Sequence, residues 1–368
     1  MQNKKILISA VAYDSGLSGI SNYIENVIRE FSKHVAVDVI INESDDKLFY
    51  NYPPNVNFIL LKKRFEKPIF NVFWHTFIFP ITQLTMGNYD FVFLPTGNRR
   101  LQAFYPHKTI VTMHDLSQFR VNKKYDIFRM FYVKNIIPRL LKNTHKLVSI
   151  SQSTKNDMIK FFKTPADKVI VNHNGVDFSK FNPKFKNPAI NQNKKFFLYL
   201  ARLEHPGKNH VNLIQSYLDL DEKIQSEYDL ILIGSDWNGS HKIKDLAKKN
   251  TNIKIKGYVS DSDLSVYFAT ASLFIFPSFF EGFGIPILQA MSSGVPVISS
   301  NTSSMPEVCG DSALMFNPNS NIEIKNAIIR VITNKKLNQK MVKKGFSQCE
   351  KFTWELHVSE ILKIAKEA

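Results

Sequence analysis

The strongest chemical signal in the sequence is a glycine-rich segment that follows a short apolar run. Residues 280–297 read FEGFGIPILQAMSSGVPV and come after SLFIFPS at 272–278. This order predicts a strand, a loop carrying Glu281 and Gly284, and a helix that begins near Pro286, since proline suits the first helical position. Amides at such a helix start bind anions such as a diphosphate. Glu281 can accept hydrogen bonds from sugar hydroxyls, and Gln289 follows about two helical turns later.

A second signal is a pair of basic residues in ARLEHPGKN at 201–209, directly after the predicted strand 196–202. Arg202 offers a planar fork and Lys208 a point charge, so the two can converge on one phosphate group. Surface Arg and Lys are common, and this pair alone is a weak indication. It gains weight because it lies at the carboxyl end of a strand in the same half of the chain as the glycine loop.

Two weaker signals lie in the first half of the chain. Gly16 and Gly19, in DSGLSGISN at 14–22, come before a helix expected near Ile20 and predict a small anion-binding loop, although a plain turn fits equally well. His114 ends the strand-like run KTIVTMHD, where it could hydrogen-bond a sugar or help with a proton, or serve a structural role.

The segment GYVSDSDL at 257–264 offers a further strand end, where Tyr258 and Val259 could hold a nucleobase through backbone contacts. Asp261 and Asp263 have the Asp-x-Asp spacing that binds Mn²⁺ or Mg²⁺ in another class of sugar transferases. We favour a helix cap at this point. Because Arg202 and Lys208 can already neutralise a diphosphate, we expect no metal and no cofactor.

These residues must be positioned by short apolar strands that alternate with helices. Strands rich in Val and Ile, apolar on both faces, predict parallel sheets covered on both sides. The expected strands are KKILISAV (4–11), VDVIIN (37–42), NFILLK (57–62), DFVFLP (90–95), KTIVTMHD (108–115), KLVSIS (146–151), KVIVNHN (168–174), FFLYLAR (196–202), DLILIGS (229–235), NIKIKGYV (252–259), SLFIFPS (272–278) and VPVISS (295–300).

The alternation breaks once, in a polar stretch that contains Pro183 and Pro188 and has no periodicity. We therefore expect an N-terminal domain at 1–178, a linker at 179–195 and a C-terminal domain at 196–350. An amphipathic helix at 351–368 is expected to pack back across the hinge. Since ligands of such sheets bind at the carboxyl ends of the strands, we expect the site in a cleft between the domains.

Composition narrows the possible partners. The 368 residues carry a formal net charge of +16, and residues 1–178 hold 24 Lys and Arg against 14 Asp and Glu. Such a surplus suits nucleic acid, an anionic membrane or a phosphorylated substrate. Aromatic and basic residues are not interleaved as in nucleic-acid binders, so we expect no nucleic-acid partner. The apolar run 69–84 is shorter than a membrane span and predicts a buried helix, or alternatively one lying on a membrane surface.

Cysteine usage indicates the compartment. Two cysteines, Cys309 and Cys349, form neither a disulfide framework nor a zinc site in a chain of this length. The first residues read as a strand and not as a secretory signal. A reducing, cytoplasmic location is therefore expected.

Taken together, these segments resemble the retaining glycosyltransferases of the GT-B fold, specifically glycosyltransferase family 4. The resemblance covers nearly the whole chain. It rests on the glycine loop at 16–19, HDL (114–116), SISQSTKNDM (149–158), KVIVNHNGVD (168–177), ARLEHPGKN (201–209), GYVSDSDL (257–264), FEGFGIPILQAM (280–291) and GVPVISSNTSSMPEVCGDSALMFNP (294–318).

The resemblance implies two doubly wound, Rossmann-like α/β domains facing a central cleft. It further implies a metal-independent hexosyltransferase of the mannosyl or rhamnosyl type that acts in bacterial surface polysaccharide synthesis, in lipopolysaccharide or capsule, with retention of anomeric configuration. The donor would be a GDP-, UDP- or dTDP-sugar and the acceptor a lipid-linked oligosaccharide. A peripheral position at the inner face of the membrane would suit the basic first half of the chain.

The resemblance also suggests roles for individual residues. The signature of the family is a Glu, seven residues and a second Glu; Glu281 matches the first, which faces the donor sugar, and Gln289 replaces the second, which faces the ribose. Gln289 can still hydrogen-bond a ribose, but without charge. The remaining roles are diphosphate contacts for Arg202, Lys208, Gly16 and Gly19, backbone amides from Phe283, Gly284 and Ile285, and a sugar contact for His114.

Two alternatives within the same fold stay open at this stage. One is a sugar-nucleotide epimerase, which would need acidic groups for proton or elimination chemistry. The other is a catalytically weak relative that binds a nucleotide-sugar, which the change at Gln289 would explain.

Overall fold

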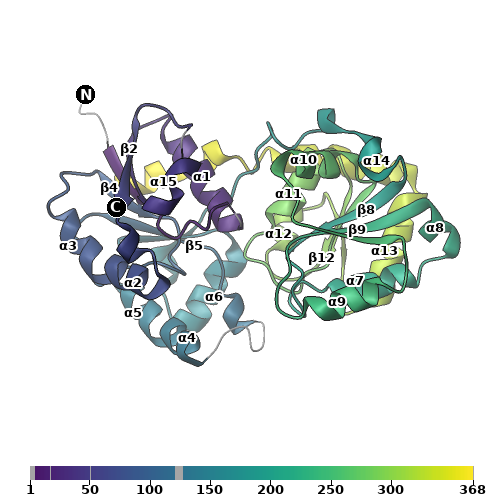
Figure 1. Ribbon diagram of the computed structural model, residues 1–368, viewed down its shortest axis with the longest axis horizontal. Helices are drawn as coiled ribbons and strands as arrows, with labels where there is room; N and C mark the ends of the chain where they lie inside the picture. Colours follow the sequence, from purple (N-terminus) through teal and green to yellow (C-terminus); the bar gives the residue numbers. More distant parts are fainter. Residues whose placement is uncertain (1–4, 17, 50, 121–126, 368) are drawn as a thin grey trace. The chain divides into compact units, whose positions relative to one another are not determined.

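The Val- and Ile-rich runs form two parallel sheets, each in its own structural unit (Figure 1). The computed structural model describes residues 5–16, 18–49, 51–120 and 127–367. Unit 1 comprises residues 1–174 and the C-terminal stretch 354–368, and unit 2 comprises residues 175–353. Lys4 and Leu17, which belong to an expected strand and an expected loop, lie outside the described residues.

The sheet of unit 1 has seven strands in the order β3-β2-β1-β4-β5-β6-β7, all parallel. This is the doubly wound order, in which the direction of winding reverses between β1 and β4. The strands are β1 (Lys5–Ser9), β2 (Ala36–Asn42), β3 (Val56–Leu61), β4 (Phe91–Leu94), β5 (Thr109–Met113), β6 (Lys146–Ser149) and β7 (Val169–Val171).

Helices cover both faces of this sheet, because alternate strand residues point to opposite sides. Ile6 and Ile8 pack into one hydrophobic cluster with α1 (Gly19–Phe31) and α15 (Trp354–Glu367), and Leu7 packs into the other cluster. Figure 1 shows the yellow helix α15 beside the purple helix α1. The remaining helices of unit 1 are α2 (Pro68–Phe73), α3 (Phe79–Gln83), α4 (Ile127–Phe131), α5 (Ile137–Lys142) and α6 (Gln152–Phe162).

Two of these helical segments widen into a π-helical turn just before a proline. The turn Trp74–Ile78 joins α2 to α3 ahead of Pro80, and the turn Tyr132–Ile136 joins α4 to α5 ahead of Pro138. Proline has no amide hydrogen and its ring crowds the carbonyl of the preceding turn, so a wider turn accommodates it.

The helix expected at 69–84 buries one face in the second hydrophobic cluster, through Trp74 and Phe79. The predicted buried helix is therefore correct for one side only, because the other side exposes large apolar side chains such as Phe73 and Phe77. Among the helices within the described ranges, none has the length and apolar character to span a membrane.

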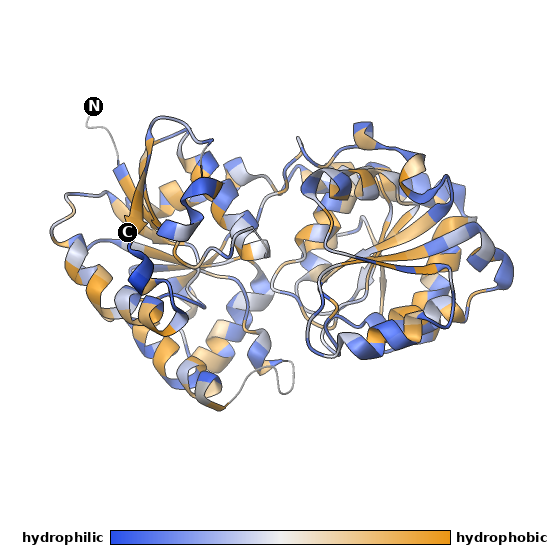
Figure 2. Ribbon diagram, in the orientation of Figure 1, coloured by the Kyte–Doolittle hydropathy of each residue, from blue (hydrophilic) through white to orange (hydrophobic). Residues whose placement is uncertain are grey.

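The sheet of unit 2 has six parallel strands in the order β10-β9-β8-β11-β12-β13. The strands of both sheets are mainly hydrophobic (Figure 2). They are β8 (Lys195–Leu200), β9 (Tyr228–Ile233), β10 (Ile253–Gly257), β11 (Leu273–Phe276), β12 (Val297–Ser300) and β13 (Leu314–Phe316). The helices are α7 (His210–Leu218), α8 (Glu222–Glu227), α9 (Ser240–Ala247), α10 (Asp261–Thr270), α11 (Ile285–Ser292), α12 (Met305–Cys309), α13 (Asn321–Thr333) and α14 (Lys335–Cys349).

The stretch expected as a linker, 179–195, is included in unit 2. It contains two short 3₁₀ turns, Pro183–Phe185 and Pro188–Asn191, which contact α10. The Asn187 amide donates to Thr270 Oγ1 at 2.9 Å, so the stretch is held against this helix.

The buried histidines make the stability of the fold depend on pH. Burial lowers the pKa of His75 and His210 to about 3 and that of His114 and His357 to about 4. Below pH 6.5 these histidines bind more protons in the unfolded chain than in the folded protein. The free energy of unfolding therefore has its full value above that pH and decreases as the pH falls towards 4. We expect the free energy of unfolding to drop by about 2 kcal/mol per histidine between pH 6.5 and 5.

The measurement is the thermal unfolding midpoint at pH 7 and pH 5. His357→Gln should reduce the difference between the two midpoints, whereas His241→Gln, at an exposed position, should not. An equal difference in the wild-type protein and in His357→Gln would contradict this expectation.

Candidate functional site

Unit 2 brings two of the predicted loops together at the point where its strand order reverses. Strands β8 and β11 are hydrogen-bonded neighbours, although β9 and β10 come between them in the chain. Both strands end at the same edge of the sheet because they are parallel. The loop after β8 carries Arg202 and Lys208, and the loop after β11 carries Glu281. Ligands of doubly wound sheets bind at this position.

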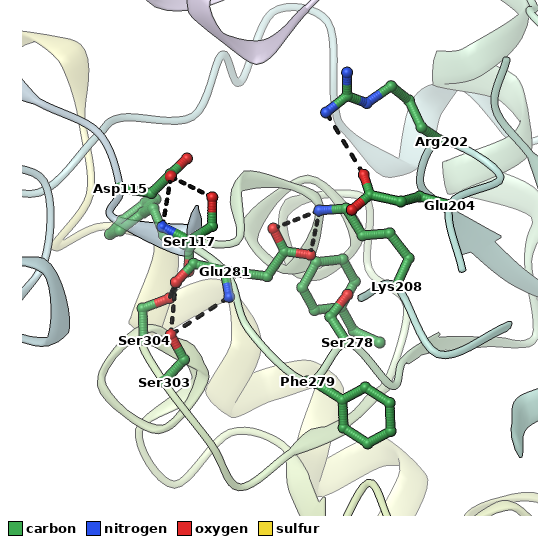
Figure 3. Close-up of polar contacts among 12 residues, drawn as sticks. Asp115, Ser117, Arg202, Glu204, Lys208, Ser278, Phe279, Glu281, Ser303 and Ser304 are labelled. Carbon is green, nitrogen blue, oxygen red and sulfur yellow. Dashed lines mark hydrogen bonds and ion pairs between the residues drawn. The ribbon is translucent and has the colours of Figure 1, made fainter. Parts of the chain in front are cut away.

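The central contact at this edge joins Lys208 to Glu281 (Figure 3). Lys208 Nζ lies 2.8 Å from both Oε1 and Oε2 of Glu281, so the ammonium group bonds both carboxylate oxygens. The two side chains are mostly buried, with 20% and 14% of their surfaces exposed. A charge-assisted contact in such a place is stronger than one on the open surface.

The Lys208 loop is tied to the end of β11 by its backbone. Tyr199 on β8 donates its hydroxyl hydrogen to the Lys208 carbonyl at 2.7 Å, and the Phe279 amide donates to the Gly207 carbonyl at 3.1 Å. The Asn209 amide group also bonds the Pro277 carbonyl at 2.9 Å. These bonds fix the distance between the lysine and the Glu281 loop.

Two serines hold the Glu281 loop from the other side (Figure 3). Ser303 Oγ donates to the Glu281 carbonyl at 2.7 Å, and Ser304 Oγ lies 3.0 Å from that carbonyl and 2.8 Å from the carbonyl of Phe283. Our sequence-based prediction missed both serines as supports of the site. The run NTSSMPEV after β12 was a usable signal, since that strand lies next to β11.

Arg202 points away from this ion pair and engages other partners in the same unit. Its guanidinium carbon lies 4.6 Å from the centre of the Trp237 ring, and Nη2 lies 3.8 Å from Glu204 Oε2. The side chain is 43% exposed and can move to a ligand. Each of the two cations of this loop therefore contacts a carboxylate of the same unit.

The helix that follows the Glu281 loop begins at Ile285, with Pro286 in its first turn. Gly284 comes before it with φ of +105°, a conformation that residues with a side chain rarely adopt. The first amides of a helix have no partner within it and can bind an anion. Phe283 is buried against Phe352, with ring centres 5.8 Å apart, so only its backbone can contribute. Gln289 lies on α11 and is 9% exposed.

Tyr258 and Val259 are not brought to the ion pair. They follow β10, the edge strand that lies two positions from β8. Tyr258 is 69% exposed and lines an open depression of about 720 Å³ together with Lys244, Lys248 and Lys256. Ser260 caps the next helix by accepting from the Asp263 amide at 3.2 Å, which confirms that this segment starts a helix.

Unit 1 places its glycine loop at the corresponding reversal, between β1 and β4. Gly16 has φ of +82°, and Gly19 is the first residue of α1, one position before the expected start. The loop after β4 contributes Arg99, whose Nη1 lies 3.2 Å from the Ala12 carbonyl and 3.4 Å from Asp14 Oδ2. Sequence reasoning missed Arg99, although it follows a predicted strand end.

His114 is a neutral side chain in this unit. Its Nε2 lies 2.7 Å from the Pro95 carbonyl, which can only accept, so Nε2 carries the hydrogen. Burial lowers the pKa of His114 to about 4. The remaining nitrogen, Nδ1, is then a hydrogen-bond acceptor at neutral pH. This geometry favours a sugar contact over proton donation.

The C-terminal helix supports the surroundings of His114. The Tyr23 ring meets the His114 ring edge-on, with centres 4.7 Å apart, and its hydroxyl bonds His357 Nε2 on α15 at 2.8 Å. His357 Nδ1 in turn lies 2.8 Å from the His173 carbonyl. The last helix of the chain thereby orders a ring that packs on a candidate site residue.

Comparison with known proteins assigns the family. The model for "Glycosyltransferase Family 4" matches residues 17–180, and the model for "Glycosyl transferases group 1" matches residues 180–348. The O-antigen chain mannosyltransferase B of Escherichia coli is 31% identical over 264 residues, which cover 68% of this chain and 69% of that protein. The chain belongs to glycosyltransferase family 4.

Solved structures show the same fold for this glycosyltransferase. The sucrose-phosphate synthase of Thermosynechococcus elongatus superimposes with a TM-score of 0.79 at 17% identity, over 99% of this chain and 98% of that one. HepE of Anabaena, solved in complex with UDP and glucose, has a TM-score of 0.76 at 16% identity, over 99% and 100% of the two chains. The predicted GT-B class of two Rossmann-like domains is confirmed.

We expect Glu281→Ala to lower kcat/KM of the glycosyltransferase by roughly a hundredfold or more, the scale for losing one preorganised polar group. The substitution removes the carboxylate but keeps the backbone that Ser303 and Ser304 hold. Steady-state kinetics and circular dichroism are the measurements. An unfolded variant would mean that Glu281 is structural, and Glu307→Ala, at a partly exposed position on α12, serves as the control.

Proposed function

We propose that this glycosyltransferase moves a hexose of the mannose or rhamnose type from a nucleotide-sugar to a lipid-linked oligosaccharide in bacterial surface polysaccharide synthesis. The observation that carries the proposal is the Lys208–Glu281 pair at the reversal of strand order in unit 2. The similarity to an O-antigen chain mannosyltransferase supports the sugar and the pathway class. The UDP and glucose bound to HepE support a nucleotide-sugar donor.

In this proposal the donor separates the ion pair, and Lys208 and Glu281 each bind a part of the donor in place of each other. The diphosphate of a GDP-, UDP- or dTDP-sugar takes up the Lys208 ammonium, and Arg202 leaves Glu204 to bind the same group. The Glu281 carboxylate then accepts hydrogen bonds from the hydroxyls of the sugar. The amides of Gly284 and Ile285 add donors at the helix start.

The reaction breaks the bond between the anomeric carbon and the leaving phosphate oxygen and forms a bond from the acceptor oxygen to that carbon. Attack on the face from which the phosphate departs retains the anomeric configuration, and the acceptor proton passes to the leaving phosphate. Lys208 and Arg202 stabilise the charge that grows on the diphosphate. Because these two cations supply that charge, the proposal requires no metal and no cofactor.

The remaining contacts of the proposal lie in unit 1. His114 accepts a hydrogen bond from the donor sugar through Nδ1, and the loop at Gly16 and Gly19 binds the diphosphate. The enzyme works in the cytoplasm and attaches peripherally to the inner face of the membrane, where a lipid-linked acceptor lies.

The test incubates the full chain with a panel of GDP-, UDP- and dTDP-sugars and a lipid-linked oligosaccharide, with and without a chelator. We expect one donor to give a glycosylated lipid whose anomeric configuration, read by NMR, matches that of the donor, at a rate that the chelator does not change. An epimerised nucleotide-sugar would favour the epimerase instead. Binding without turnover that Gln289→Glu restores would indicate a catalytically weak relative.

We expect Arg202→Ala and Lys208→Ala each to lower kcat/KM by roughly a hundredfold to a thousandfold, because each removes one cation from the diphosphate. This loss corresponds to about 2.7 to 4 kcal/mol of transition-state stabilisation. The measurement is kcat/KM for the donor found above. Lys335→Ala, an exposed lysine on α14, is the matched control and should leave the rate unchanged. Unchanged rates in both site variants would remove the diphosphate assignment.

A further inference from the structure

The outer side of the helical segment 68–84 in unit 1 exposes an unusual number of large apolar side chains. From Phe70 onward they recur every three or four residues, which places them along one side of the helix. We call them the apolar face: Ile69 (81% exposed), Phe70 (53%), Phe73 (51%), Phe77 (50%), Ile81 (57%) and Leu84 (65%). Over this length the row spans about 22 Å at a rise of 1.5 Å per residue. Figure 2 shows the hydrophobic colour on α2 and α3.

Polar and aromatic contacts on the opposite side of the segment fix the rotation of the helix about its own axis. The apolar face therefore points outward because of these contacts. His75 bonds Ser9 on β1 at 2.9 Å, and the Asn71 oxygen accepts from Arg100 at 2.5 Å. The Trp74 and Phe79 rings stack inward with centres 5.2 Å apart. These contacts prevent a rotation that would bury the outer side chains.

A second helical segment of the same unit also exposes large apolar side chains. Ile127 and Phe131 on α4 are 85% and 61% exposed and lie four residues apart, hence on one side of the helix. The segment continues into α5, which packs into the same hydrophobic cluster as Trp74 and Phe79 through Ile137. Both segments therefore cover the same side of the unit 1 sheet.

Basic side chains accompany both segments, with little acid to balance them. In the ranges 62–89 and 127–149 the only carboxylate is Glu66. The exposed basic residues are Lys62, Lys63, Arg64, Lys67, Arg129, Lys134, Arg139 and Lys142. Lys63, Arg64 and Lys134 form no ion pair with any residue in the described ranges. The charges of these three residues are therefore not neutralised by ion pairs among the described residues.

We propose that the apolar face, together with Ile127 and Phe131, binds the surface of an anionic lipid bilayer. The exposed rings enter the interface between head groups and acyl chains, to the depth of 5–10 Å usual for an amphipathic helix. The basic residues meet the anionic head groups, each adding to attraction at the surface. The proposal deepens the proposed function, because it supplies the surface on which a lipid-linked acceptor would be met, but lipid binding itself requires no donor or acceptor.

Charge favours a lipid surface over a second copy of the chain. A symmetric dimer through this face would bring the same patch of each copy together. Lys63 and Arg64 of one copy would then face the same basic residues of the other copy and repel them. Glu66 is the only carboxylate of the segment that could offset this repulsion. An anionic bilayer offers the complementary charge over the whole patch.

The experiment is flotation of the full chain with vesicles of phosphatidylcholine alone and vesicles with one third phosphatidylglycerol. We expect binding only to the anionic vesicles, weakened by added salt. Lys63→Gln/Arg64→Gln should bind about thirtyfold more weakly, the ratio that corresponds to about 1 kcal/mol for each charge. Phe73→Ser/Phe77→Ser should lose at least about tenfold through the lost apolar burial.

The matched controls lie in unit 2. Ile322→Ser, at a 67% exposed isoleucine on α13, and Lys335→Gln/Lys336→Gln on α14 should bind vesicles like the wild-type protein. Equal loss in these controls, or no loss in either test variant, overturns the proposal. A wild-type dimer in light scattering that Phe73→Ser/Phe77→Ser converts to a monomer would assign the face to self-association and also overturn it.

The thermal unfolding midpoint of Phe73→Ser/Phe77→Ser reports whether this variant folds. If it does not fold, Lys63→Gln/Arg64→Gln still tests the proposal. The outcome is also separable from that of the proposed function. Vesicle binding without sugar transfer would contradict the proposed reaction alone. Transfer to a short-chain, water-soluble acceptor without vesicle binding would contradict the lipid surface alone.

Discussion

The contact on which the site depends is the bond of one ammonium group to both oxygens of one carboxylate. Lys208 and Glu281 come from loops that are 73 residues apart in the chain, and they meet because β8 and β11 are adjacent parallel strands. Each side chain is mostly buried, so either charge alone would be costly in this place. Each partner of the pair therefore stabilises the charge of the other at the edge of the sheet.

A parallel sheet imposes this arrangement twice in the chain. Both faces of such a sheet are covered by helices, so polar groups that must reach a ligand can only follow the strands at their carboxyl ends. Unit 2 has Lys208 and Glu281 there, and unit 1 has Asp14 and Arg99. In each unit the cation and the carboxylate lie in the loops that follow the two strands on either side of the reversal. These two loops run in different directions, so the space between them is open to side chains.

The sequence was sufficient for the strands and for the residue types at the site. All twelve expected strands are present, because most of them are short apolar runs that are buried on both faces, although β3 and β10 are partly exposed. Strand β13 was not expected, since its three residues show no usable pattern. The loop residues Glu281 and Lys208 were identified from their motifs. Their pairing was not, and neither were Ser304 and Arg99, because each of these depends on which strands are neighbours in space.

The helix at 68–84 shows a different limit of sequence reasoning. Its apolar residues occur on all sides, so hydrophobicity alone predicted a buried helix and could not select the buried side. The polar residues made that selection: Asn71 and His75 find partners only inside the unit, and a polar group buried without a partner is costly. Satisfying them turns Phe73 and Phe77 outward. The exposed apolar face is therefore a consequence of buried polar contacts, and the surplus of basic residues beside it determines what kind of surface it can meet.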